Sequence, residues 1–179
     1  MEPLVPAAPW LMAAAALVSA VACVAAWRAV PWQGRQSALV MAAGMLVLAI
    51  PGVDALTRLA LGAVLLVSAM LGTMGVRGTA AAATCCHRAL VSLVMAVCAF
   101  DGSVVVSSVE RAVTPTGHGG HGLGGVLSAL VMIGVAAVVL WTVAAAWFVP
   151  PLHHGRTGRL LATESWAMAA GVAVMCLGF

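Results

Sequence analysis

Six long apolar runs, separated by short connections, fill almost the whole chain of 179 residues. A helix needs about 20 mostly apolar residues to cross a bilayer, so six such helices would use about 120 positions. Hydrophobic residues make up 64% of the sequence and charged residues only 7%, whereas soluble domains are about 45–50% apolar and about 25% charged. This composition excludes a soluble globular enzyme, a nucleic-acid binder and a disordered chain.

We expect an all-α membrane protein with a single polytopic transmembrane domain, residues 1–179. Pro, Gly or a charged residue marks each helix end. The six spans are expected at about residues 7–26, 33–50, 56–76, 80–100, 123–149 and 160–179. The fourth span is expected to end at Asp101–Gly102. The segment 104–113 after it fits either an interfacial amphipathic helix or a plain connection along the membrane.

The charged residues predict the orientation of the spans. All eight basic residues are arginine, and six of them lie in the first, third and fifth connections with one acid, Glu164, near them. These six are Arg28, Arg35, Arg77, Arg88, Arg156 and Arg159. The other side carries Arg58 and Arg111 together with four acids, among them Asp54, which is expected to cap the third helix. The positive-inside rule therefore places both termini outside and the six arginines in the cytoplasm of a bacterial cell.

A short repeat links the second, fourth and sixth spans. Met41-Ala-Ala-Gly44 recurs as Met168-Ala-Ala-Gly171, and the same register aligns His87 with Ser37 and Glu164. Positions 0, 4, 8 and 11 of this register lie within about 80° on a helix, so they form one stripe on each span. The methionines of the three stripes are Met41, Met45, Met95, Met168 and Met175.

This repeat predicts three helical hairpins in a pseudo-repeat, related by an axis along the membrane normal. Small residues at Gly44 and Gly171 would allow neighbouring helices to approach closely. The alternative is a chance match, because membrane helices rich in Ala, Gly and Val often share four residues.

Helices that open with His and carry Met at helical spacing, in a small six-span protein, resemble an actinobacterial integral-membrane family of unknown function. The resemblance covers most of the chain and implies a six-span fold, but it implies no activity. Only His87 keeps the expected His, while Ser37 and Glu164 occupy the matching positions. Any metal or cofactor site that the family builds from these histidines would therefore have a different set of ligands in this chain.

Two groups of His and Cys are candidate metal ligands. His118 and His121 lie in an external Gly-rich loop, and imidazole suits copper, zinc and nickel. Two ligands fall short of the four that zinc prefers, and a solvated loop is the alternative. Cys85, Cys86 and His87 lie at the cytoplasmic end of the fourth span. They would face His153–His154 if the hairpins pack together, and thiolates select soft metals such as copper.

The sequence lacks a nucleophile elbow, a phosphate-binding Gly-rich loop and a His-Glu-x-x-His motif. Glu164, level with His87, is the acid whose role should be tested first; the alternative is a favourable charge near a helix N-terminus. We therefore expect a membrane protein without catalysis of its own, acting as an accessory or interaction subunit. Its expected partners are the lipid bilayer and a membrane protein or second copy, not nucleic acid.

Copper binding or transport through His, Cys and the methionine stripes is the alternative function. Against it, adjacent cysteines do not form the usual Cys-x-x-Cys clamp, and buried Met is most often core filler. A lipid-facing enzyme is the third and least favoured hypothesis.

Overall fold

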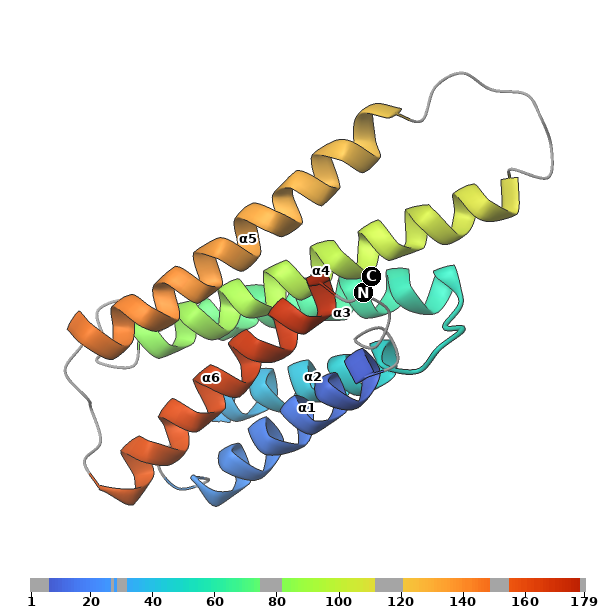
Figure 1. The fold of residues 1–179 in the computed structure, drawn as a ribbon. Coiled ribbons are helices and arrows are strands. Elements are labelled where there is room, and N and C mark those ends of the chain that lie inside the picture. The colour runs from blue at the N-terminus through green and yellow to red at the C-terminus, as the bar shows by residue number, and fades with distance from the viewer. Residues whose placement is uncertain are drawn as a thin grey trace.

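The computed structural model describes residues 7–26, 28, 32–74, 82–111, 121–148 and 155–177, except for the side chains at 33, 104–111, 121–124, 176 and 177. All regular structure in these residues is helical, which confirms the predicted all-α class (Figure 1). The helices are α1 Ala8–Ala25, α2 Trp32–Leu48, α3 Ala55–Thr73, α4 Ala82–Arg111, α5 His121–Phe148 and α6 Arg156–Leu177.

Helix α4 differs most from the prediction. The sequence predicts an end at Asp101–Gly102, but the helix continues through both residues to Arg111. A single Gly inside a helix costs only about 1 kcal/mol relative to Ala. Here Gly102 makes room for Arg58 of α3, whose Nη1 atom lies 2.7 Å from the place a Cβ would occupy. Residues 104–111, which the sequence predicts in a separate interfacial helix or in a connection, therefore form the last part of α4.

Among the residues that the structure describes, four helical segments are long and apolar enough to cross a membrane. They are Ala8–Ala25, Ala55–Thr73, Ala82–Ser103 and Gly125–Phe148, while α2 contributes a shorter apolar helix, Gly34–Leu48. The segment in α4 is the most enclosed of the four, with 50% of its most apolar 18-residue stretch buried. The segment in α5 is the least enclosed, with 11% of that stretch buried. The described residues thus have the make-up of a membrane protein built around α4.

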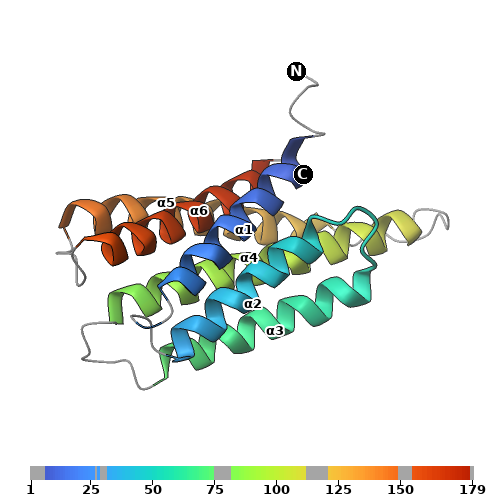
Figure 2. The same cartoon turned by 90° about the horizontal axis from the view of Figure 1, so that it is seen from below.

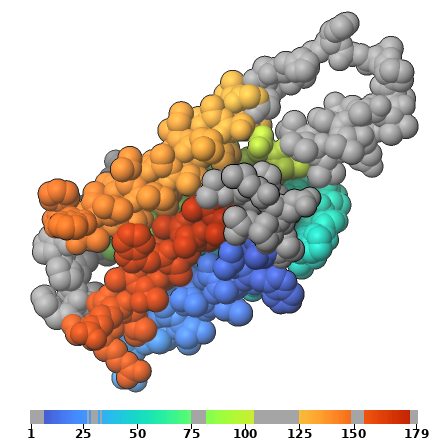
Figure 3. All heavy atoms as spheres, viewed as in Figure 1, coloured from blue at the N-terminus to red at the C-terminus, as the bar shows by residue number. Residues whose placement is uncertain are grey.

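The six helices pack in a regular order. Each odd-numbered helix contacts the helix that follows it and one further even-numbered helix: α1 contacts α2 and α6, α3 contacts α4 and α2, and α5 contacts α6 and α4. Figures 1 and 2 show the result, in which α1, α3 and α5 end at the same side of the bundle where α2, α4 and α6 begin. In the space-filling view, α1, α6 and α5 lie side by side across one face (Figure 3).

The stripes expected on α2, α4 and α6 face the core. All five stripe methionines are buried, as are Ser37, His87 and Glu164 at the first stripe position. The contacts between stripes follow one pattern. Met95 of α4 approaches Gly44 of α2, and Met45 of α2 approaches Gly171 of α6. When Ser37, His87 and Glu164 are counted as position 0 of the repeat, both contacts join position 8 of one helix to position 7 of another.

The N-terminus of α3 is capped as the sequence predicts. Asp54 Oδ2 accepts a hydrogen bond from the Thr57 backbone N–H at 2.9 Å, and Oδ1 accepts one from the Thr57 hydroxyl at 2.6 Å. These bonds favour the ionised carboxylate, first through the Thr57 side chain and then through its backbone, and so lower the pKa of Asp54.

We expect the Asp54 cap to make stability depend on pH. A lowered folded-state pKa adds stability above the unfolded value of about 3.9, and this stability is lost as pH falls through the folded value. Asp54→Asn keeps a capping oxygen but cannot titrate. Thermal unfolding in detergent at pH 7 and pH 3 should show a smaller loss of Tm for Asp54→Asn than for the wild-type chain. Asp101→Asn is the control, and an equal pH effect in both variants would contradict the assignment.

Candidate functional site: a buried polar cluster

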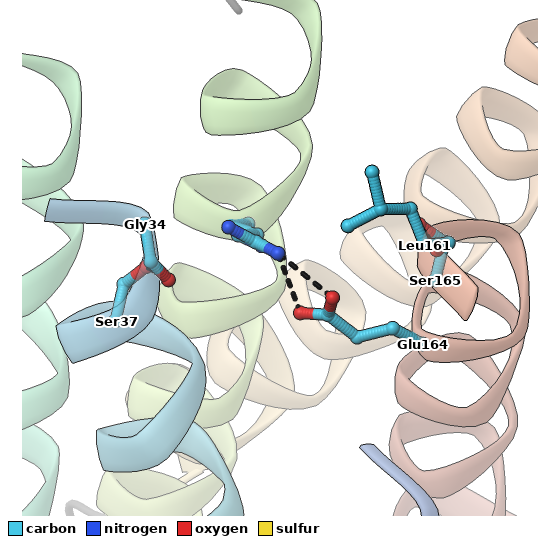
Figure 4. Close-up of polar contacts among 6 residues, drawn as sticks. Gly34, Ser37, Leu161, Glu164 and Ser165 are labelled. Atoms are coloured by element: carbon cyan, nitrogen blue, oxygen red, sulfur yellow. Dashed lines mark hydrogen bonds and ion pairs between the residues drawn. The ribbon is translucent and has the colours of Figure 1, made fainter. Parts of the chain in front are cut away.

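An ion pair between α4 and α6 is the main polar feature of the described core. Arg88 Nη2 donates to both carboxylate oxygens of Glu164, at 2.7 Å to Oε1 and 2.8 Å to Oε2 (Figure 4). The two side chains are only 5% and 2% exposed. Both charged groups have left water, so each depends on the other for its stabilisation.

The sequence pattern singles out Glu164 but not its partner. The pattern places Arg88 with the arginines of the connections, whereas Arg88 lies more than a turn inside α4 and is buried. The sequence does carry one signal, because Glu164 is the only acid near these arginines and the repeat places it level with His87, the neighbour of Arg88. Burial of Arg88 removes one arginine from the six that predict the orientation. Five arginines remain on that side of the spans against two on the other, so the predicted orientation does not change.

The neighbouring residue, His87, connects α4 to α5. His87 Nε2 lies 3.0 Å from Thr142 Oγ1, and both residues are buried. The Thr142 hydroxyl donates its one proton to the Val138 carbonyl at 2.8 Å. It must therefore accept from His87, which places a proton on Nε2. Consecutive residues of α4 thus hold α5 and α6.

Removing the acceptor should weaken the α4–α5 contact. Thr142→Val keeps the volume of the side chain but leaves the buried His87 N–H without its partner, and such a loss costs about 1–3 kcal/mol. We expect a lower Tm in detergent for Thr142→Val and a near-normal Tm for Thr142→Ser, which keeps the hydroxyl. Equal Tm values for these two variants would show that the hydrogen bond does not stabilise the bundle.

Helices α1 and α2 add further groups around the ion pair. Cys23 of α1 is fully buried and lies within electrostatic range of Glu164, Arg88 and Arg35. Ser37 of α2 is buried and donates to the Gly34 carbonyl at 3.0 Å (Figure 4). The Arg35 guanidinium lies over the ring of Trp32, 5.6 Å from its centre. The cluster therefore draws on α1, α2, α4, α5 and α6.

Two serine hydroxyls deeper in the bundle have no hydrogen-bond partner among the described residues. They are Ser19 on α1 and Ser92 on α4, which are 1% and 0% exposed. Ser92 lies one helical turn after Arg88, and Ser19 one turn before Cys23, so each continues the polar side of its helix inward. An unpaired hydroxyl in an apolar core costs free energy, so neither serine adds a stabilising hydrogen bond to the described part of the bundle.

The described residues give no support to a metal centre in the cluster. No three His, Cys, Asp or Glu side chains among them are grouped to hold an ion. Cys85, Cys86 and His87 follow one another on α4, so their side chains project about 100° apart. Accordingly, Cys85 and His87 are buried and Cys86 is exposed. His118, the His121 side chain and His153–His154 lie outside the described residues, so the metal hypothesis stays a prediction.

Comparison of the chain with family models, with curated proteins and with solved structures gave no match. The resemblance to an actinobacterial membrane family stays a prediction.

Proposed function

We propose that the chain is a six-span protein of the bacterial cytoplasmic membrane, without catalysis of its own, that works as an accessory or interaction subunit. The observation that carries this proposal is the use made of the buried polar groups. Arg88 and Glu164 bind each other, His87 binds Thr142, and Ser37 binds the Gly34 carbonyl. The first two pairs join helices and the third lies within α2, and this use favours a structural role over chemistry on a substrate.

We further propose that the six spans form three hairpins with pseudo-three-fold symmetry. The packing order supports this, because each odd-numbered helix sits between the even-numbered helix of its own hairpin and that of the preceding one. The contacts of Met95 with Gly44 and of Met45 with Gly171 support it too, because they join the same two positions of the repeat. In this arrangement both termini lie outside the cell, and the Arg-rich end of the bundle lies in the cytoplasm.

Reporter fusions test this topology. A cytoplasmic reporter such as green fluorescent protein should be active when fused after Arg28, and an external reporter such as alkaline phosphatase when fused after Gly52. The opposite pattern would overturn the orientation. Activity of the same reporter at both sites would overturn the crossing of α2, the helix with the shorter apolar part.

The accessory role predicts a partner whose amount or activity depends on this chain. The full-length chain, extracted gently from its native membrane, should run as a complex of fixed stoichiometry. Deleting the gene should lower the amount or activity of the partner. The wild-type chain should restore it, and so should Leu56→Ala, which changes a side chain that is 76% exposed. A single-chain species in the native membrane, or a partner indifferent to the deletion, would overturn the proposal.

Copper handling is not favoured by a specific contact of the described residues. The copper hypothesis can be tested by metal analysis of the purified chain after titration with Cu(I).

A further inference from the structure

The end of the bundle where α2, α4 and α6 begin carries a large excess of positive charge. Five arginines are described there, while Glu164 is the one described acid. Glu164 is neutralised by Arg88 inside the bundle. Arg28, Arg156 and Arg159 are exposed, and Arg35 is half-buried. At the opposite end, Arg58 is accompanied by Asp54 and Asp101, so among the described residues the excess of positive charge lies at one end.

The helix dipoles add to this charge. Three helices, α2, α4 and α6, begin at this end, and none has an acidic residue in its first turn. Each helix N-terminus carries about half a positive charge on its free N–H groups. The backbone and the side chains therefore make this end attractive to an anion.

Exposed aromatic side chains at the same end indicate where the anion comes from. Trp32 begins α2 and is 57% exposed, and Trp147 and Phe148 end α5 and are more than 80% exposed. Tryptophan at such positions lies at the level of lipid headgroups. The exposed aliphatic surface of the adjoining spans would contact the acyl chains of the same lipids.

We propose that this arginine-rich end binds the phosphate groups of anionic phospholipids, through Arg28, Arg156 and Arg159. The guanidinium groups would bind phosphate oxygens with paired N–H bonds, while Trp32 and Trp147 border the site on the lipid side. The inference rests on the membrane placement proposed above. It adds a lipid preference that the accessory role does not require.

Lipid binding by the full-length chain, measured with native mass spectrometry and in nanodiscs, tests the proposal. The probes are phosphatidylglycerol and phosphatidylcholine. The wild-type chain should prefer phosphatidylglycerol, and the preference should shrink at high salt because screening weakens surface charge interactions. The variant Arg28→Gln/Arg156→Gln/Arg159→Gln should bind phosphatidylglycerol more weakly, by about fivefold for each arginine removed. Its binding of phosphatidylcholine should not change.

Arg58→Gln is the matched control, because it removes one positive charge from the opposite end of the bundle. Equal binding of the two lipids by the wild-type chain would overturn the proposal. So would an equal loss per arginine in the control and the triple variant, or competition by millimolar inorganic phosphate. Failure of the chain to float with liposomes would instead overturn the membrane placement, so the two failures are distinguishable.

Discussion

Glu164→Ala should be among the most destabilising single substitutions in this protein. The change leaves the Arg88 guanidinium charged and buried, with its carboxylate partner gone. Breaking a buried ion pair by removing one partner costs about 3–5 kcal/mol. We expect a strongly reduced Tm of the detergent-purified chain, read by fluorescence-detected size exclusion after heating. Thr163→Ala, at the neighbouring exposed position, is the control and should unfold like the wild-type chain.

A double variant separates the ion pair from simple loss of packing. Arg88→Met/Glu164→Leu replaces both charges with apolar side chains of similar length, and such exchanges are often neutral or stabilising. We therefore expect the double variant to be more stable than either Arg88→Met or Glu164→Leu alone. Additive losses across this cycle would show that the two residues act independently, and the described ion pair would then not stabilise the bundle.

The second large effect is expected at Gly62, where the Phe100 ring of α4 packs against α3. A Cβ at Gly62 would lie 2.6 Å from Cε1 of the Phe100 ring and 2.9 Å from two further ring atoms. The ring is rigid, so it must swing as a whole or push the helices apart, and overpacking of this kind costs about 1–3 kcal/mol. We expect Gly62→Ala to lower the Tm, despite the better helix propensity of alanine.

Gly44→Ala is the matched control for this prediction. A Cβ there would meet Leu65 and Met95 at 3.5 Å, which is ordinary van der Waals contact. We expect Gly44→Ala to be neutral or slightly stabilising, since alanine favours the helix by up to about 1 kcal/mol. Phe100→Leu should partly rescue Gly62→Ala by removing the ring. A Gly62→Ala variant as stable as Gly44→Ala would contradict the close α3–α4 packing.

These two glycines also show what helical spacing leaves open. Gly44 and Gly171 recur in the repeat, and this recurrence predicts close approach of helices at both. At Gly171 a Cβ would lie 3.1 Å from Met45 Sδ, so contact there is close, but at Gly44 it is ordinary. Tighter contacts are at Gly62, at Gly102 and at Gly134, where Val94 of α4 lies 2.7 Å from the Cβ position. Which glycine meets a bulky side chain depends on the neighbouring helix.

In the candidate site too, the sequence predicts which residues face the core but not which residues they contact. The repeat predicts that Ser37, His87 and Glu164 share one level and that the methionine stripes share one face of each helix, and the burial of the methionines agrees with the second of these predictions. No sequence pattern pairs His87 with Thr142, which lies 55 positions away. The sequence also assigns Arg88 to a connection, because a charged residue near a span end is usually solvated.

The sequence by itself determined the all-helical class and the approximate bounds of most helices, because the length and period of an apolar run depend on neighbours along the chain. It also determined the sorting of arginines toward one end. Only the tertiary structure decided that Arg88 and Glu164 meet, that α4 continues through Gly102, and which glycines lie under large side chains. Each of these depends on contacts between helices far apart in sequence, where burial changes the free energy of a charge or a ring and no local pattern records the partner.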